Sequence, residues 1–260
     1  MGSEGPRTIF HVTGFKRFQG VHENPTEVLV SELEEHMARN GGMPAGSVLG
    51  SCTVLETAAS GGLKALLELL DNAQEEEVRP CKLDANVDGE DTSLSAAPLA
   101  NKAPPRANEV PPRIVWVHFG VNSGASKFAL ERRAVNEASF RCPDEMGWQP
   151  HKQPIVPEDG GMNHCRETKL NADLFVRSLR VRGFDVALSD DAGRFVCNYV
   201  YYQSLRHAEA NGNMSVFIHV PTFAVVSKEQ QFWFVENVLE LLANCAWSDQ
   251  GSLREHTYSQ

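Results

Sequence analysis

The stretch Ile114-Val115-Trp116-Val117-His118-Phe119-Gly120 decides the fold class. It is an almost continuous apolar run, which is typical of a parallel strand buried on both faces. Similar runs recur along the chain, and helical patterns separate them. Strands are predicted at 8–13, 47–55, 114–120, 184–189 and 216–220, and helices at 25–39, 62–77, 172–182, 192–206 and 228–246. This alternation predicts an α/β chain, a single-domain three-layer α/β/α fold with a mostly parallel central sheet.

The segment 78–112 interrupts the alternation. It contains six of the fourteen prolines and no aromatic residue. Pro104-Pro105 and Pro111-Pro112 exclude helix and central strand where they occur. We therefore expect a disordered, acidic, Pro-rich insertion at 78–112 inside one domain that spans 8–246. A linker between two domains is the alternative. The ends, 1–7 and 247–260, are predicted to be flexible.

The charge of the chain excludes several classes of partner. The 260 residues include 34 acids and 24 Lys and Arg, for a formal net charge of −10. A nucleic acid or an anionic membrane attracts a basic face, so neither is expected as a partner. No apolar run has the length of a membrane span, and the N-terminus lacks the pattern of a secretory signal. A cytoplasmic location is expected, and there the six cysteines are reduced thiols.

Three residues with the right chemistry for nucleophilic catalysis lie near predicted strand ends, where α/β sheets form their sites. Cys197 lies in the early turns of a predicted helix, whose positive end favours a thiolate. His219 lies in the strand 216–220, and Glu131 follows the strand 114–120. A thiol nucleophile needs a base, and the base needs a group that orients it. Taken singly, Cys197 and His219 also fit the core, and Glu131 fits a solvated helix face.

A metal site is the alternative for other cysteines and histidines. Cys142, His151, His164 and Cys165 follow one another in the sequence, but their spacings fit no familiar zinc pattern. We therefore predict neither a metal nor a cofactor.

Four groups of motifs, in order along the chain, resemble the pyroglutamyl peptidase I family (pyrrolidone-carboxylate peptidases, cysteine peptidase family C15). The matching segments are Val12-Thr13-Gly14-Phe15 with Phe18, Gly20 and Asn24-Pro25-Thr26, then His118-Phe119-Gly120 with Glu131, Asn136 and Arg141-Cys142-Pro143-Asp144, then Asp191-Ala192-Gly193-Arg194-Phe195-Val196-Cys197-Asn198, and last Phe217-Ile218-His219-Val220-Pro221. The resemblance covers roughly residues 8–75 and 113–246. Members of this family are cysteine peptidases that remove an N-terminal pyroglutamyl residue from peptides.

The resemblance implies a catalytic triad. In it Cys197 is the nucleophile, His219 is the base and acid, and Glu131 is the orienting carboxylate. The implied substrates are small N-terminally pyroglutamylated peptides, cleaved through a thioester intermediate. The family includes monomers and tetramers, so assembly into a homo-oligomer stays open.

The resemblance also implies a substrate pocket. Phe15, Phe18 and Phe195 match positions that line the pocket for the pyroglutamyl ring, and core packing is the alternative role for them. Arg141 matches an arginine beside the catalytic centre, where it can contact an oxyanion. A surface charge or an ion pair with Asp144 is the alternative role for Arg141.

Two departures from the family pattern concern the substrate rather than the triad. Arg17 stands where the family commonly has proline between the two loop phenylalanines, and this predicts a less rigid loop. Val121 stands where many bacterial members have glutamine, so a side-chain contact there is lost. The alternatives to a pyroglutamyl peptidase are another thiol hydrolase on this fold and a non-catalytic or weakly active member that binds N-terminally blocked peptides.

Overall fold

The computed structural model describes residues 7–77 and 111–245. The strands are β1 (Thr8–Phe15), β2 (Ser47–Leu55), β3 (Arg113–Val121), β4 (Phe128–Glu131), β5 (Arg133–Val135), β6 (Cys165–Glu167), β7 (Val186–Ser189) and β8 (Met214–Val220). The helices are α1 (Pro25–Arg39), α2 (Ala59–Glu77), the 3-10 helix η1 (Pro157–Asp159), α3 (Ala172–Val181), α4 (Val196–Ala210) and α5 (Lys228–Asn244). The predicted insertion at 78–112 and the predicted flexible ends lie almost wholly outside the described residues.

Six strands form one sheet in the order β2-β1-β3-β8-β4-β7. The pairings β1–β2, β1–β3, β3–β8 and β4–β7 are parallel, and only β4–β8 is antiparallel. The mostly parallel sheet is therefore confirmed. β4 and the reversal of direction are not among the predicted features, because four residues are too few for a clear period. Residues 122–127 alone connect β3 to β4, and a parallel return needs a crossover of about a dozen residues or more.

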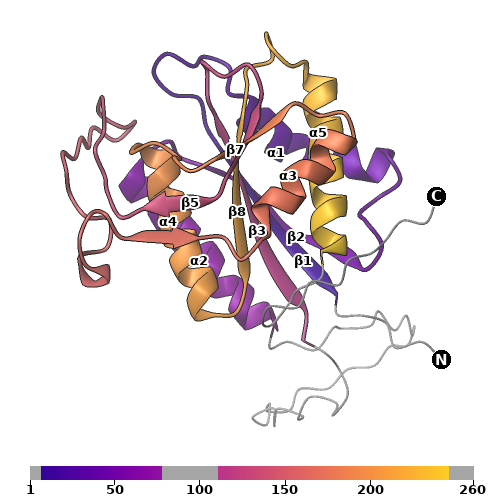
Figure 1. The fold of residues 1–260 in the computed structure, drawn as a ribbon, viewed down its shortest axis with the longest axis horizontal. Coiled ribbons are helices and arrows are strands. Elements are labelled where there is room, and N and C mark those ends of the chain that lie inside the picture. Colours follow the sequence, from indigo (N-terminus) through magenta and orange to yellow (C-terminus); the bar gives the residue numbers. More distant parts are fainter. Residues whose placement is uncertain (1–6, 78–110, 246–260) are drawn as a thin grey trace, which may run out of the picture.

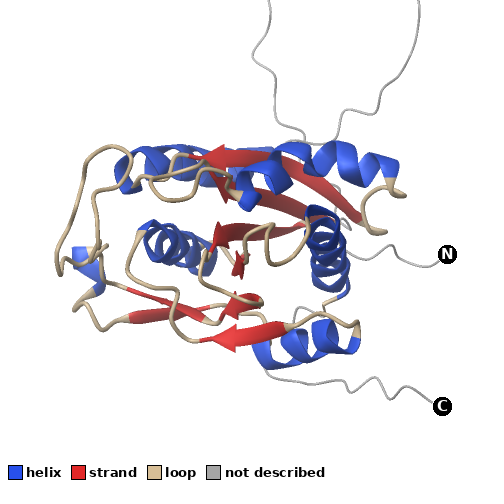
Figure 2. Cartoon of the chain, turned by 90° about the horizontal axis from the view of Figure 1, so that it is seen from above, coloured by secondary structure: helices blue, strands red, loops and turns tan. Residues whose placement is uncertain are grey.

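Helices cover both faces of the sheet, so the structure has the three layers that the sequence predicts (Figures 1 and 2). In Figure 1, α2 and α4 lie on one side of the sheet and α1, α3 and α5 on the other. Val115 and Val117 face the core under α1, α3 and α5, whereas Ile114 and Trp116 face the core under α2 and α4. The apolar run in β3 is thus buried on both faces. No helix among the described residues combines the length and the apolar character needed to cross a bilayer.

Two details of the elements affect the site, and the second corrects a prediction. The strand β7 runs opposite to β8, and Ser189 lies at the level of Phe217 rather than at the edge where Val220 ends. The helix α4 begins at Val196, four residues after the predicted start at Ala192. Gly193 causes the delay, because its φ of 81° lies in the left-handed region and ends any earlier helical turn.

Candidate active site

The late start of α4 makes Cys197 the second residue of the helix. The N-cap is Phe195, whose side chain makes no capping hydrogen bond. The first backbone N–H groups of a helix have no intrahelical partner, and they carry the positive end of the helix dipole. The half-buried thiol of Cys197 therefore lies where a negative charge is stabilised.

Gly120, near the carboxyl end of β3, makes room for the thiol. A Cβ atom built on Gly120 would lie 3.0 Å from Cys197 Sγ and 2.8 Å from two ring atoms of Phe217. Gly120 has no positive φ, so the requirement for glycine is one of space and not of backbone conformation. The close approach places the thiol against the sheet at the level of Gly120, which pairs with His219.

The imidazole of His219 is held by Glu131. His219 lies in β8 and is 8% exposed, and Glu131 ends β4 and is 2% exposed. Glu131 pairs with Phe217 in the antiparallel register, so it lies diagonal to His219 on the same face of the sheet. The Nδ1 atom of His219 is 2.8 Å from Glu131 Oε1. Glu131 is therefore neither on a helix nor solvated.

The surroundings of His219 favour its protonated form. Burial alone lowers the pKa of this histidine, but hydrogen bonds to Cys197 and Glu131, together with their negative charges, raise the pKa to about 10. Nδ1 is engaged by Glu131, which leaves Nε2 as the ring nitrogen for the thiol. The thiol, the imidazole and the carboxylate thus follow one another in one line, an arrangement in which a histidine can activate a cysteine.

The three phenylalanines of the predicted pocket lie around this line, although not in one contact. Phe18 faces Phe195 with 6.4 Å between ring centroids. Phe15 is buried and instead packs against Phe217, at 6.3 Å, and Phe217 is 5.0 Å from the His219 ring. Phe18 and Phe195 are half-buried, so part of each side chain is exposed.

Two further aromatic residues, which were not predicted from the sequence, pack next to Phe195 and Tyr199. Phe140 lies 4.7 Å from Phe195, and Trp148 lies 5.3 Å from Phe140 and 5.9 Å from Tyr199. Both lie in the loop 136–150. The signal available in the sequence was their position on either side of the Arg141-Cys142-Pro143-Asp144 motif.

Arg141 is exposed, and it makes no ion pair with Asp144. The carboxylate of Asp144 accepts hydrogen bonds from the backbone N–H groups of Ala59, Met146 and Trp148, at 2.9–3.0 Å. Asp144 therefore organises its own loop and the start of α2. The alternative role for Arg141, an ion pair with Asp144, is therefore wrong.

The loop that carries Phe18 is fixed by hydrogen bonds despite Arg17. The N–H of Arg17, which a proline would lack, donates to Glu27 Oε2 at 2.9 Å. The N–H of Gln19 donates to Glu145 Oε1 at 2.9 Å, and Phe18 and Val21 close the turn with two backbone bonds. Hydrogen bonds thus hold this loop in place without a proline at position 17.

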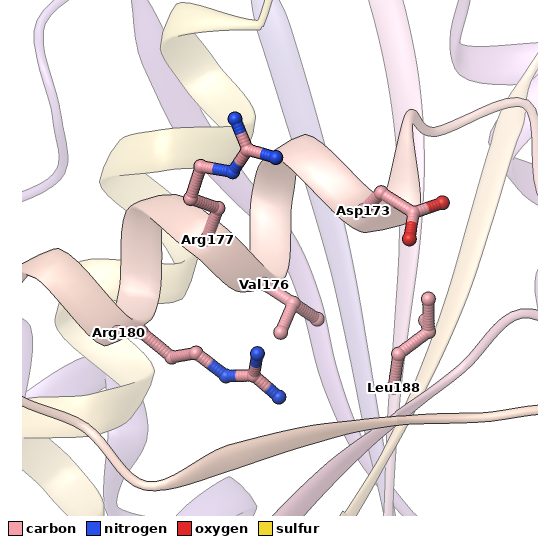
Figure 3. A pocket seen from close by; sticks show the side chains of 5 residues that line it. All are labelled: Asp173, Val176, Arg177, Arg180 and Leu188. Carbon is pink, nitrogen blue, oxygen red and sulfur yellow. The ribbon is translucent and has the colours of Figure 1, made fainter.

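Other features of the described residues lie apart from this line. No group of three or more His, Cys, Asp and Glu side chains there could hold a metal ion. His164 instead shares a 2.7 Å hydrogen bond with the hydroxyl of Tyr202. A shallow depression of about 170 Å³ lies on α3 and β7, lined by Asp173, Val176, Arg177, Arg180 and Leu188 (Figure 3). It contains none of the triad or pocket residues.

Comparison with known proteins points to one family. The family model described as pyroglutamyl peptidase matches residues 96–232, slightly more than half of the chain, and this range contains Glu131, Cys197 and His219. Phe15 and Phe18 lie outside the matched range.

Relatives and solved structures agree. The pyrrolidone-carboxylate peptidases of Pyrococcus furiosus and Pseudomonas fluorescens strain SBW25 are 38% and 40% identical over 107 and 103 residues. These alignments cover 40% and 39% of this chain and 50% and 46% of the relatives, so the chain spans about half the length of the curated relatives it matches. A crystal structure of pyrrolidone carboxyl peptidase from Pyrococcus furiosus has a TM-score of 0.68 at 25% identity, covering 90% of this chain and 97% of that one. Because the family model matches more than half of the chain and the solved structure has the same fold, the chain belongs to the pyroglutamyl peptidase family.

Proposed function

We propose that the chain hydrolyses the amide bond that follows an N-terminal pyroglutamyl residue, as a cysteine peptidase. One observation carries this proposal: Glu131 holds His219 at 2.8 Å in surroundings that raise its pKa, and Cys197 lies at the N-terminus of the neighbouring helix. The names of the relatives, pyrrolidone-carboxylate peptidases, supply the substrate class.

The first chemical step is acylation of Cys197. The thiolate attacks the carbonyl carbon of the pyroglutamyl residue, and the carbonyl oxygen becomes an oxyanion. The unpaired N–H groups at the start of α4 are suited to bind that oxyanion, since each such donor is typically worth about 10²–10³ in rate. The exposed guanidinium of Arg141 is a second candidate donor.

The second step releases the peptide. The His219 imidazolium gives its proton to the leaving amine, the C–N bond breaks, and a thioester joins the pyroglutamyl group to Cys197. The imidazole, now neutral, takes a proton from water, whose oxygen attacks the thioester. Free pyroglutamate leaves, and the thiolate–imidazolium pair returns. Glu131 keeps Nδ1 of the imidazole protonated throughout, so that Nε2 always faces the thiol.

The aromatic residues suit the ring of the substrate. A pyroglutamyl ring is a small neutral lactam with two flat faces and no free amine, and the half-buried rings of Phe18 and Phe195 offer apolar walls for it. A charged side chain in this pocket would add a desolvation cost and no matching partner. A prolyl ring lacks the lactam carbonyl, so it leaves the polar groups of the pocket unpaired, and the site rejects it.

Hydrolysis of a pyroglutamyl fluorogenic amide, with the prolyl amide beside it, tests the proposal. We expect cleavage of the pyroglutamyl amide only, no cleavage by Cys197→Ala or His219→Ala, and a smaller loss in Glu131→Gln. Equal cleavage of the two amides, or activity in Cys197→Ala, would contradict the proposal. A non-catalytic member that only binds blocked peptides is recognised by slow alkylation of Cys197, at a rate like that of Cys52 or Cys245.

A further inference from the structure

The helix that carries Cys197 is bound to the chain that follows Glu131. The hydroxyl of Tyr201 donates to the backbone carbonyl of Glu131 at 3.0 Å. The amide of Asn198 accepts from the N–H of Val135 at 2.9 Å and donates to the carbonyls of Val135 and Glu137, at 2.8 and 3.0 Å. Two adjacent turns of α4 thus bind the segment 131–137 at three backbone positions.

These bonds are buried and specific. Asn198 and Tyr201 have no exposed surface, so water cannot replace the bonds when they break. The two residues are three apart and share a face of the helix. Asn198 fixes the position of α4 along the segment, because its amide bonds to one N–H and two carbonyls at once. Tyr201, one turn further along, fixes the rotation of the helix about its axis.

We propose that Asn198 and Tyr201 are positioning residues, which hold the nucleophile of α4 in register with the His219–Glu131 pair of the sheet. The inference rests on the proposed function for its assay, but not for its geometry. Glu131 fixes His219 through its side chain and is itself fixed by Tyr201 through its backbone. The thiol and the carboxylate therefore belong to one hydrogen-bonded unit, although 66 positions separate them in the sequence.

The chain contains a matched control for each residue. Gln231 in α5 is equally buried, and its side-chain amide donates to the backbone carbonyls of Pro221 and Val226, at 2.9 and 3.0 Å. Tyr202 follows Tyr201 and is equally buried, and its hydroxyl donates to Asp159 and shares a hydrogen bond with His164, both at 2.7 Å. The hydrogen bonds of both control side chains go to residues outside the segment 131–137.

The test compares Asn198→Ala with Gln231→Ala, and Tyr201→Phe with Tyr202→Phe. For each variant kcat and KM for the pyroglutamyl amide, the rate of alkylation of Cys197 by iodoacetamide, and the melting temperature are measured. A displacement of about 1 Å at a reacting atom costs up to about 10²-fold in rate, so we expect kcat of Asn198→Ala to fall by about 10- to 100-fold. For Tyr201→Phe, which loses one bond, we expect a fall of about 3- to 10-fold. KM should change little, and the alkylation rate should fall with kcat.

The controls separate positioning from mere stability. Gln231→Ala and Tyr202→Phe should lower the melting temperature by similar amounts while kcat and the alkylation rate of Cys197 stay within about twofold. Equal kinetic losses in a variant and its control would overturn the inference. If Asn198→Ala does not fold, the Tyr201→Phe pair decides alone. If the wild-type chain cleaves no pyroglutamyl amide, the proposed function fails, and the alkylation rates still decide the inference.

Discussion

Gly120→Ala is the change for which the structure predicts the largest effect from the smallest perturbation. The new methyl group would lie 3.0 Å from Cys197 Sγ and 2.8 Å from two ring atoms of Phe217. Carbon atoms in contact prefer about 3.5–4.0 Å, so the neighbours must move by roughly 0.5–1 Å. Both neighbours belong to the site: Cys197 is the proposed nucleophile, and Phe217 packs against His219.

Two magnitudes follow from that displacement. Overpacking a buried site by one methyl group typically costs about 1–3 kcal/mol, and for a domain of this size each kcal/mol lowers the melting temperature by about 2–4 °C. Moving the thiol by up to about 1 Å from the attack geometry lowers kcat by up to about 10²-fold. We therefore expect a stable protein with a lower melting temperature and a large loss of kcat.

The assay measures kcat for the pyroglutamyl amide and the melting temperature, with Gly124→Ala as the control. A Cβ atom at Gly124 would meet nothing closer than Asn122 Oδ1 at 3.7 Å, so that variant should behave like the wild type. If Gly120→Ala keeps kcat within about twofold of wild type while Gly124→Ala also does, the thiol does not need the space at Gly120, and the reasoning is refuted.

Three further predictions concern the site and its supports. NMR titration of His219 should give a pKa near 10 in the wild type and a lower pKa in Cys197→Ala, which lacks the hydrogen bond from Cys197 that raises it. The stability that the His219 proton contributes is complete below about pH 6.5 and is lost as the pH rises toward 10. An equal pKa in both proteins would contradict this prediction. Glu27→Ala removes the acceptor for the N–H of Arg17 and should raise KM by about 3- to 10-fold. Adding Arg17→Pro removes that N–H, so the double variant should recover the KM of the wild type. A double variant with a higher KM than Glu27→Ala alone would argue against this role of the hydrogen bond. Asp144→Asn keeps the shape but loses an acceptor for backbone N–H groups, so the melting temperature should fall by about 4–8 °C, from about 2 kcal/mol, and an unchanged melting curve would count against this role.

The sequence predicts the long elements of this fold well and the short ones poorly. The apolar run of β3 and the Asn24-Pro25 start of α1 each have a local physical cause, so both appear where they are expected. The four residues of β4 show no usable period, and nothing in them reveals that they pair antiparallel with β8. The direction of that strand depends on the length of the connection before it, which no residue pattern encodes.

The site shows the same division. Cys197, His219 and Glu131 could be selected because motif order and spacing identify them, and the structure brings them together. Asn198 stands in the same motif as Cys197, but its role and that of Tyr201 could not be predicted, since their bonds go to backbone atoms of a distant segment, and a backbone acceptor leaves no trace in the sequence.

The antiparallel strand β4 explains why the carboxylate of Glu131 lies further inside the sheet than His219 and not at the sheet edge. In a wholly parallel sheet, a residue that ends a strand lies at the same edge as the ends of its neighbours, where it would compete with the substrate for space. Because β4 runs backwards, its last residue, Glu131, lies at the level of Phe217, inside the sheet relative to His219. The Nδ1 atom of His219 then faces inward to the carboxylate, and Nε2 is left for the edge, where Gly120 makes room for the thiol. The order carboxylate, imidazole, thiol follows from the direction of one four-residue strand.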